Sequence, residues 1–211
     1  MSDLFTSIRE PIQEIYPQVW LLANYFDSSI IEAEIPSITA ASPFRKMMTP
    51  MGHYTGIALT NCGDFGWVSD RNGYRYVTHD PLNGMPWPPM PEVFSRLATR
   101  AAESVGFRGF KPDAGLINQY LPGTRLSAHQ DKNEKDFRWP IVSLSLGLPA
   151  IFQIFGRSRS GRPIECQLLD GDLLVWGGDA RLVYHGVKPI KSDPQNPSLT
   201  HRINVTLRRA G

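Results

Sequence analysis

Residues 140–155 read PIVSLSLGLPAIFQIF, and residues 163–176 read PIECQLLDGDLLVW. Each stretch contains short apolar runs separated by turn residues. In the second stretch, Asp170-Gly171 separates the two runs. Short strands at this spacing are typical of a sandwich, barrel or jelly roll. The same pattern extends outward from residue 112 to the end of the chain. The strands that it predicts are residues 113–120, 140–147, 150–155, 163–169, 172–176, 182–187 and 201–208.

The N-terminal part of the chain mixes strand and helix signals. Residues 19–22 (VWLL) predict a short strand, and Asp27 offers an N-cap for a helix over residues 30–34. A clearer helix begins at Pro91, carries an apolar stripe and ends near Gly106. We therefore expect a mainly β fold with flanking helices, of the α+β class.

Between these helices, residues 45–90 combine aromatic, sulfur-containing and basic side chains with frequent glycines. This pattern predicts short hairpins that carry exposed aromatic side chains, with the basic Arg71 and Arg75 among them. The aromatic, histidine and methionine residues of the stretch include Met47, Met48, His53, Tyr54, Phe65, Trp67, Tyr74, Tyr76 and Trp87.

The composition limits the class of protein. A chain of 211 residues is about one domain by length, and 41% hydrophobic with 20% charged residues is typical of a globular protein. Its 18 glycines and 18 prolines favour many tight turns. The net charge of +2 creates no strong global field, so a nucleic-acid site would have to be a local patch.

The cysteines and the N-terminus bear on the cellular compartment. Cys62 and Cys166 match no metal-binding spacing and predict two buried thiols in a reducing compartment. Residues 1–25 carry acids and prolines where a signal peptide needs an unbroken apolar run. No stretch approaches the roughly 18 apolar residues that span a membrane. We expect a cytoplasmic protein, and nothing in the sequence indicates more than a monomer.

The pair His129-Gln-Asp131 places an imidazole and a carboxylate two residues apart. In extended backbone such residues point to the same side, so both can reach one ion, and His185 is the candidate third ligand. Two histidines and one carboxylate form the facial triad that leaves open positions on Fe(II) for substrate and O₂. The alternative is a chance H-x-D pair with an unrelated histidine. Three further histidines are not assigned to a metal: His53, His79 and His201.

Residues 202–208 (RINVTLR) alternate strictly between polar and apolar side chains. A solvent-exposed amphipathic strand is one interpretation. The other is that Arg202 and Arg208 converge on a small dicarboxylate, because the guanidinium fork pairs bidentately with carboxylates. Asn118 and Tyr120, also two residues apart, would add neutral donors to such a site.

Several segments together resemble the AlkB family of Fe(II)- and 2-oxoglutarate-dependent nucleic-acid dealkylases, and its bacterial members in particular. The segments are Asn118-Gln-Tyr120, His129-Gln-Asp131, Ser143-Leu-Ser-Leu-Gly-Leu-Pro-Ala150, Gly171-Asp-Leu-Leu-Val-Trp-Gly-Gly178, Tyr184-His-Gly186 and residues 202–208. Pro43-Phe-Arg45, Thr60-Asn-Cys-Gly63 and Trp67 extend the resemblance to about residues 43–208.

The chain shows no internal repeat and no low-complexity linker, so we expect one domain, residues 1–211. Within it, the resemblance implies a double-stranded β-helix (jelly roll) catalytic core over residues 112–211 and a nucleotide-recognition lid over residues 45–90. It also implies Fe(II) on the catalytic residues His129, Asp131 and His185. The cosubstrate 2-oxoglutarate would bind Asn118, Tyr120, Arg202, Asn204 and Arg208, with Arg202 at the distal carboxylate and Arg208 near the metal-chelating end.

The implied reaction is oxidative demethylation of N-alkylated bases such as 1-methyladenine and 3-methylcytosine in DNA or RNA. It would consume 2-oxoglutarate and O₂, form succinate and CO₂, and release the methyl group as formaldehyde. The target methyl group lies on the pairing edge of the base. The base must therefore be in a single strand or flipped out of the duplex.

The family match implies that Trp67 stacks on the flipped base, with His129 on the opposite face. A core tryptophan is the alternative, although Gly63 and Gly66 nearby are poor core material. Arg157, Arg159 and Arg162 predict either a phosphate-binding patch or a solvated loop. The candidate substrate contacts are Trp67, Tyr74, Thr49, Asn133 and Arg159.

Two residues depart from the bacterial pattern. His53 stands where the family has a tyrosine, and Asn133 replaces an aspartate near the substrate base.

Two other functions stay open. One is an Fe(II)/2-oxoglutarate oxygenase acting on a protein or small molecule, which would not need the aromatic stretch. The other is a cofactor-free nucleic-acid-binding β-domain, which would leave the paired arginines without a role.

Overall fold

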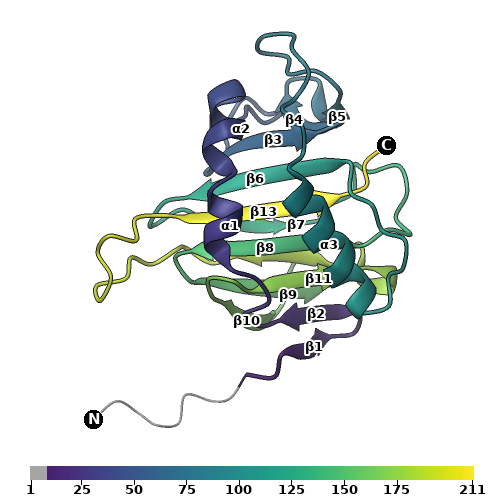
Figure 1. Cartoon of the computed structure of the whole chain (residues 1–211), viewed down its shortest axis with the longest axis vertical. Helices are drawn as coiled ribbons and strands as arrows, with labels where there is room; N and C mark the ends of the chain where they lie inside the picture. Colours follow the sequence, from purple (N-terminus) through teal and green to yellow (C-terminus); the bar gives the residue numbers. More distant parts are fainter. Residues whose placement is uncertain (1–8) are drawn as a thin grey trace.

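The computed structural model describes residues 9–211 and contains two antiparallel sheets and a separate hairpin (Figure 1). The seven-stranded major sheet has the order β1-β2-β11-β8-β13-β6-β3, and the four-stranded minor sheet the order β10-β9-β12-β7. The major strands are β1 (Ile12–Tyr16), β2 (Val19–Leu22), β3 (Ala58–Gly63), β6 (Ala114–Tyr120), β8 (Ile141–Gly147), β11 (Leu173–Trp176) and β13 (Arg202–Arg208). The others are β7 (Leu126–His129), β9 (Ala150–Gly156), β10 (Ile164–Leu168) and β12 (Tyr184–Val187), with β4 (Gly66–Asp70) and β5 (Gly73–Val77) in the hairpin.

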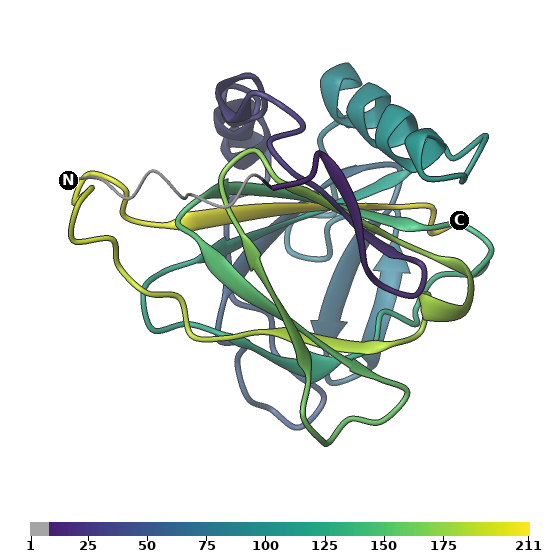
Figure 2. The same cartoon turned by 90° about the horizontal axis from the view of Figure 1, so that it is seen from below.

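The helices cover one face of the major sheet, and the minor sheet lies on the opposite side (Figure 2). They are α1 (Ser28–Glu32), α2 (Ile35–Ala41) and α3 (Glu92–Ser104), with a 3₁₀ turn η1 (Gly178–Ala180) after β11. One apolar cluster joins these helices to the major sheet, and a second lies largely between the two sheets. The mainly β fold with flanking helices is confirmed, as is the double-stranded β-helix core.

Strand alternation decides what each side of the major sheet carries. In β13, Ile203, Val205 and Leu207 belong to the helix-side cluster. Because side chains alternate along a strand, the polar residues of β13 must face the minor sheet. All seven residues of β13 are buried, so the solvent-exposed interpretation of this strand is wrong. The period-two pattern of β13 does not say which of its faces is covered. β13 pairs with β6 and β8 on either side, so it is a central strand, and its polar face is buried on the side of the minor sheet.

All seven strands predicted from residue 112 onward are present, with ends shifted by at most two residues. The strand at 19–22 and the helix beginning at Pro91 are also confirmed. The Asp27 side chain caps α1 by accepting from the Ser29 amide at 3.0 Å. The helix ends at Glu32, earlier than predicted, because a second helix with Pro36 in its first turn follows directly. β1 and β7 are not predicted by the sequence pattern, because both are short and weakly apolar.

The stretch 45–90 is only partly as predicted. It contains the β4-β5 hairpin, but it also supplies β3, one of the two edge strands of the major sheet. Met47 and Trp87 are buried rather than exposed, and the Trp87 indole donates to the Val77 carbonyl at 2.9 Å. Trp87 lies against Gly66, where an added Cβ would come within 2.2 Å of its ring. Such close packing explains why this tryptophan is a core residue.

Two further predictions concern the cysteines and membrane-spanning segments. Cys62 is buried as predicted, but Cys166 is only half-buried, on the outer strand β10 of the minor sheet. Both are free thiols. Within residues 9–211, no helix is long and apolar enough to cross a membrane.

Candidate active site

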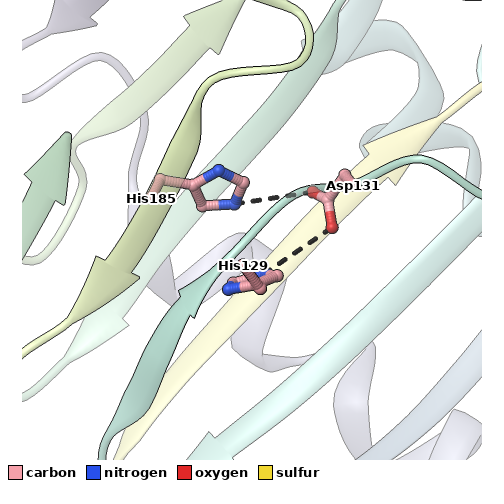
Figure 3. A group of neighbouring side chains, drawn as sticks. All are labelled: His129, Asp131 and His185. Carbon is pink, nitrogen blue, oxygen red and sulfur yellow. Dashed lines mark ion pairs between the residues drawn. The ribbon is translucent and has the colours of Figure 1, made fainter. Parts of the chain in front are cut away.

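Three side chains, from two neighbouring strands and the segment that follows one of them, meet at one point between the sheets (Figure 3). His129 ends β7, and Asp131 follows two residues later. β12 pairs with β7 so that His185 lies opposite His129. The Nε2 atoms of His129 and His185 lie 3.7 Å from Oδ1 and Oδ2 of Asp131, respectively. One ligand atom from each residue lies within 4.8 Å of the others, so this group can hold a metal ion.

The tautomers of the two histidines suit a metal. The Nδ1 atom of His129 lies 3.0 Å from the Ser127 carbonyl oxygen, and that of His185 lies 3.1 Å from the Val183 carbonyl oxygen. A carbonyl can only accept, so each Nδ1 carries a proton, and Nε2 is the atom that offers a lone pair to a metal when the imidazole is neutral. Both lone pairs belong to the atoms that approach Asp131.

Charge states at the site also favour a divalent ion. Burial, reinforced by the nearby His129, lowers the pKa of His185 to about 4, so its imidazole is neutral at physiological pH. Burial by itself would raise the pKa of Asp131, but the adjacent Arg208 guanidinium outweighs it and holds that pKa well below its usual range. Two neutral imidazoles and one carboxylate are the donor set of non-haem Fe(II) oxygenases. The residues present therefore fit Fe(II).

The three residues lie in a cavity of about 660 Å³ that reaches from the major sheet to the β4-β5 hairpin. The other residues predicted to bind the cosubstrate and the five candidate substrate contacts also line it. We call the buried group the cavity floor and the more exposed group the cavity rim. The floor is Asn118, Tyr120, Arg202, Asn204 and Arg208. The rim is Thr49, Trp67, Tyr74, Asn133 and Arg159.

Arg202 marks one end of the floor as an anion site. Its side chain is buried, and it donates to the Ser145 hydroxyl at 2.8 Å and to the Leu148 carbonyl at 3.3 Å. Its Nε has no hydrogen-bond partner, and no carboxylate in residues 9–211 forms an ion pair with it. Burial lowers its pKa to about 10, which still leaves it charged. A buried, uncompensated guanidinium requires an anionic partner.

Polar side chains of the floor are held in place by their neighbours. Asn204 donates through Nδ2 to the Ser143 hydroxyl at 2.7 Å, and its Oδ1 accepts from Thr206 at 2.9 Å and from Asn118 at 3.3 Å. Tyr120 is buried, and that burial raises its pKa to about 12, so its hydroxyl stays protonated and can donate. The floor is thus a set of oriented donors around a fixed positive charge.

At the other end of the floor, Arg208 belongs to a buried charge cluster. It donates to Asp131 at 2.8 Å, and its Nε lies 3.3 Å from Glu134. Arg181 lies 2.9 Å from the other oxygen of Glu134, and the Tyr76 hydroxyl donates to Glu134 at 2.8 Å. Two arginines therefore balance two carboxylates. Sequence reasoning assigned no role to Glu134, Arg181 or Tyr76, and no local pattern distinguishes these residues from solvated charges.

The rim is built around an aromatic pair. The rings of Trp67 and Tyr74 stack with centroids 5.6 Å apart and an interplanar angle of 17°. The Trp67 indole donates to Asn133 Oδ1 at 3.3 Å, and Asn133 Nδ2 donates to the Tyr74 carbonyl at 3.3 Å. Trp67 is half-buried and lines the cavity, so it is not a fully buried core tryptophan.

The remaining candidates divide between the cavity and the solvent. Arg159 lines the cavity and donates to the Ala128 carbonyl at 3.0 Å, whereas Arg157 and Arg162 lie outside the cavity lining. His53 is exposed and lies outside it too, but its neighbour Tyr54 lines the cavity. Sequence reasoning assigned Tyr54 no role, although its place in the aromatic stretch was a usable signal.

Comparison with known proteins agrees with this geometry. The sequence profile of the 2OG-Fe(II) oxygenase superfamily matches residues 18–208. The alpha-ketoglutarate-dependent dioxygenase AlkB of Escherichia coli K12 is 46% identical over 215 aligned positions, which cover 100% of this chain and 99% of that protein. The chain belongs to the AlkB family. It is therefore an Fe(II)- and 2-oxoglutarate-dependent dioxygenase that uses O₂.

Two more distant AlkB relatives cover almost the whole chain. A DNA N(6)-methyladenine demethylase, ALKBH1A of Arabidopsis thaliana, is 33% identical over 94% of this chain and 54% of its own length. The structure of OsALKBH1 superposes with a TM-score of 0.79 at 26% identity, covering 94% of this chain and 100% of that one. Membership of the AlkB family excludes the cofactor-free β-domain considered from the sequence.

Proposed function

We propose that the chain removes alkyl groups from ring nitrogens of nucleobases, such as 1-methyladenine and 3-methylcytosine, in DNA or RNA. The methyl carbon is hydroxylated, with one oxygen atom of O₂ going to that carbon and the other to succinate as 2-oxoglutarate loses CO₂. The hydroxymethyl group then leaves the nitrogen as formaldehyde, and the nitrogen regains its ordinary valence. The alkylation damage is thereby reversed directly.

One observation carries the proposal. The metal-ligating group and the stacked aromatic pair of the rim line a single cavity. An aromatic surface at the entrance suits a planar base, because base–aromatic stacking contributes about 1–3 kcal/mol and tolerates any base. A methyl group on such a base would point toward His129 and His185. The Arabidopsis relative is named for demethylating a base in DNA, which supports the same substrate class.

Each part of the cavity has a separate task. We assign His129, Asp131 and His185 as the iron ligands; bound iron supplies the activation of O₂ that couples decarboxylation to hydroxylation. The floor holds 2-oxoglutarate, with the unpaired charge of Arg202 on one carboxylate. Asn118, Tyr120, Asn204 and Arg208 complete this site.

The rim binds the alkylated base. Trp67 stacks on it, with His129 on its opposite face. Tyr74 and Thr49 contact the neighbouring backbone, Asn133 lies at the edge of the base, and Arg159 binds a phosphate. We propose residues 45–90 as the recognition lid over a catalytic core at residues 112–211, in a cytoplasmic monomer.

The test is mass spectrometry of oligonucleotides that each carry one alkylated base, after incubation with protein, Fe(II), 2-oxoglutarate and O₂. We expect loss of about 14 mass units per methyl group (CH₂, by atomic mass), with matching formaldehyde and succinate. Omission of 2-oxoglutarate is the control. Succinate formation that methylated oligonucleotides do not stimulate, together with unaltered oligonucleotides, would instead favour a protein or small-molecule substrate.

A further inference from the structure

Asp131 differs from the two histidines of the metal-ligating group in its backbone. Both histidines lie on paired strands, whereas Asp131 lies on irregular backbone beyond the end of β7 (Figure 3). Residues 131–139 contain no helix or strand. Within the described residues 9–211, their one backbone–backbone hydrogen bond runs from the Lys135 amide to the Ala210 carbonyl, at 3.3 Å. Side chains must therefore hold this ligand in place, because no strand ladder does.

One buried side chain contacts both ends of this segment. Arg181 is only 3% exposed. Its Nη1 donates to the Asp131 carbonyl at 2.7 Å, and its Nε donates to the Trp139 carbonyl at 3.1 Å. Its Nη2 lies 2.9 Å from the Glu134 carboxylate, and its Cζ lies 5.3 Å from the centroid of the Phe137 ring. All three nitrogen atoms of one guanidinium are thus used on the segment that carries the metal-ligating carboxylate.

Arg181 itself stands on well-fixed backbone. It follows the turn η1 directly, and its amide donates to the Gly178 carbonyl at 3.1 Å. The next carbonyl, that of Leu182, accepts from the Gln130 side chain at 2.6 Å. Two side chains therefore cross between the same two segments in opposite directions. One segment carries Asp131, and the other leads into β12 and His185.

The buried ion pair alone does not explain this arrangement. Pairing with Glu134 uses only one nitrogen atom of Arg181. A buried ion pair is also weak evidence for stability, because the desolvation of both charges offsets much of their attraction. The two hydrogen bonds to backbone carbonyls are the part that an ion pair does not need. They require an arginine, whose planar fork holds its N–H groups in fixed directions.

We propose that Arg181 is a positioning residue for the metal, which fixes the backbone at Asp131 so that its carboxylate faces the two histidines. Arg208 donates to that carboxylate at 2.8 Å, so different arginines hold the side chain and the backbone of one ligand. Arg181 does not line the cavity and therefore acts through Asp131 rather than on the substrate or the cosubstrate. The inference rests on the proposed assignment of Asp131 as an iron ligand.

The main test is Arg181→Lys, which keeps a positive charge beside Glu134 but loses the fork. Its dissociation constant for Co²⁺, measured by isothermal titration calorimetry on metal-free protein, should rise by roughly 10–100-fold, as is usual when a partner outside the ligand shell is lost. Co²⁺ is the probe because it binds the same donors more tightly than Fe²⁺ does. Arg138→Lys is the matched control and should keep the wild-type affinity, since Arg138 lies on the same segment with its side chain 88% exposed.

A second variant separates positioning from folding. Arg181→Met combined with Glu134→Gln removes both charges of the pair, so that no unpaired buried charge remains between them. It should lose Co²⁺ affinity as Arg181→Lys does, and it decides the question if Arg181→Lys does not fold. A merely structural role would lower the melting temperature of the metal-free protein but leave the Co²⁺ affinity of the folded protein unchanged. That result would overturn the proposal.

Asp131→Ala tests the assignment on which the proposal rests. Loss of Co²⁺ affinity in Asp131→Ala together with wild-type affinity in Arg181→Lys would overturn the positioning role alone. Wild-type affinity in Asp131→Ala would refute Asp131 as a ligand, and the role of Arg181 with it. Loss of affinity in both variants, with none in Arg138→Lys, is the result that we expect.

Discussion

The cavity floor and the cavity rim serve one site but are built differently. The floor lies on β6 and β13, which are paired along their whole lengths inside the major sheet, and its five side chains are buried. The rim lies on a two-stranded hairpin and on loops, and its polar contacts are few, such as the two of Asn133 at 3.3 Å. A strand that is hydrogen-bonded to its neighbours along its whole length keeps its position when one side chain is lost. The conformation of an isolated two-stranded hairpin depends on its side-chain contacts.

This difference separates the tasks of the enzyme. Groups that handle iron and 2-oxoglutarate need fixed geometry, because the reacting atoms must be positioned within a fraction of an ångström. Groups that select the base can change with little effect on the fold, since exposed substitutions are mostly near neutral for stability. Changes near the floor should therefore abolish chemistry or cosubstrate binding, and changes on the rim should alter the choice of nucleic acid.

The largest expected effect is loss of a metal ligand beside the floor. His129→Ala, Asp131→Ala or His185→Ala should each reduce formaldehyde release by more than about a hundredfold, because loss of partners outside the ligand shell already costs roughly 10–100-fold. Fe(II) binding measured on the same proteins should fall in parallel. His79→Ala is the matched control, since His79 is exposed and does not line the cavity. Full activity in any ligand variant would remove that residue from the triad.

The next effect concerns the floor's unpaired charge. Arg202→Ala should raise the KM for 2-oxoglutarate by about ten- to 150-fold, because a hydrogen bond to a charged group contributes roughly 1.5–3 kcal/mol. The KM for the oligonucleotide should barely change. Arg138→Ala, at an exposed arginine paired with Asp136, is the control. An unchanged 2-oxoglutarate KM would defeat the assignment of β13 to the cosubstrate.

The reverse selectivity is expected at the rim. Trp67→Ala should lower kcat/KM for the methylated oligonucleotide by roughly tenfold, within the range of about 1–3 kcal/mol for base–aromatic stacking. The KM for 2-oxoglutarate should stay at its wild-type value, and Trp67→Phe should keep most activity. If both KM values rose together and the melting temperature fell, Trp67 would be structural, and the separation of floor from rim would fail.

The smallest effect tests selectivity within the rim. 1-Methyladenine and 3-methylcytosine are cationic near neutral pH, so Asn133→Asp should favour them over neutral adducts such as etheno-adenine. Charge-assisted hydrogen bonds exceed neutral ones by about 1 kcal/mol, or roughly fivefold in the ratio of kcat/KM values. The ratio of kcat/KM values for cationic and neutral adducts should be measured for the wild type and for Asn133→Asp at one salt concentration. A flat ratio, or one that moves toward the neutral adducts, would mean that Asn133 does not face the base.

The sequence by itself determined most strands of the core and their alternation, although not β7. The seven strands from residue 112 onward, the spacing of His129 and Asp131, and the period-two pattern of residues 202–208 are local properties of the chain. Extended backbone sends alternate side chains to opposite faces whatever lies around it. For that reason the amino-acid pattern could propose the candidate ligands, the family resemblance favoured them over a chance pair, and the fold brings them together.

Only the tertiary structure decided which faces and which loops matter. From the sequence, the polar face of β13 could equally lie against solvent, and only the packing of the minor sheet shows that it is buried. Trp67 and Trp87 stand in the same aromatic stretch, yet one lines the cavity and the other packs on Gly66. Glu134 gains its two arginine partners, Arg181 and Arg208, from elements far along the chain. Burial and ion pairing depend on neighbours distant in sequence, and no local pattern encodes them.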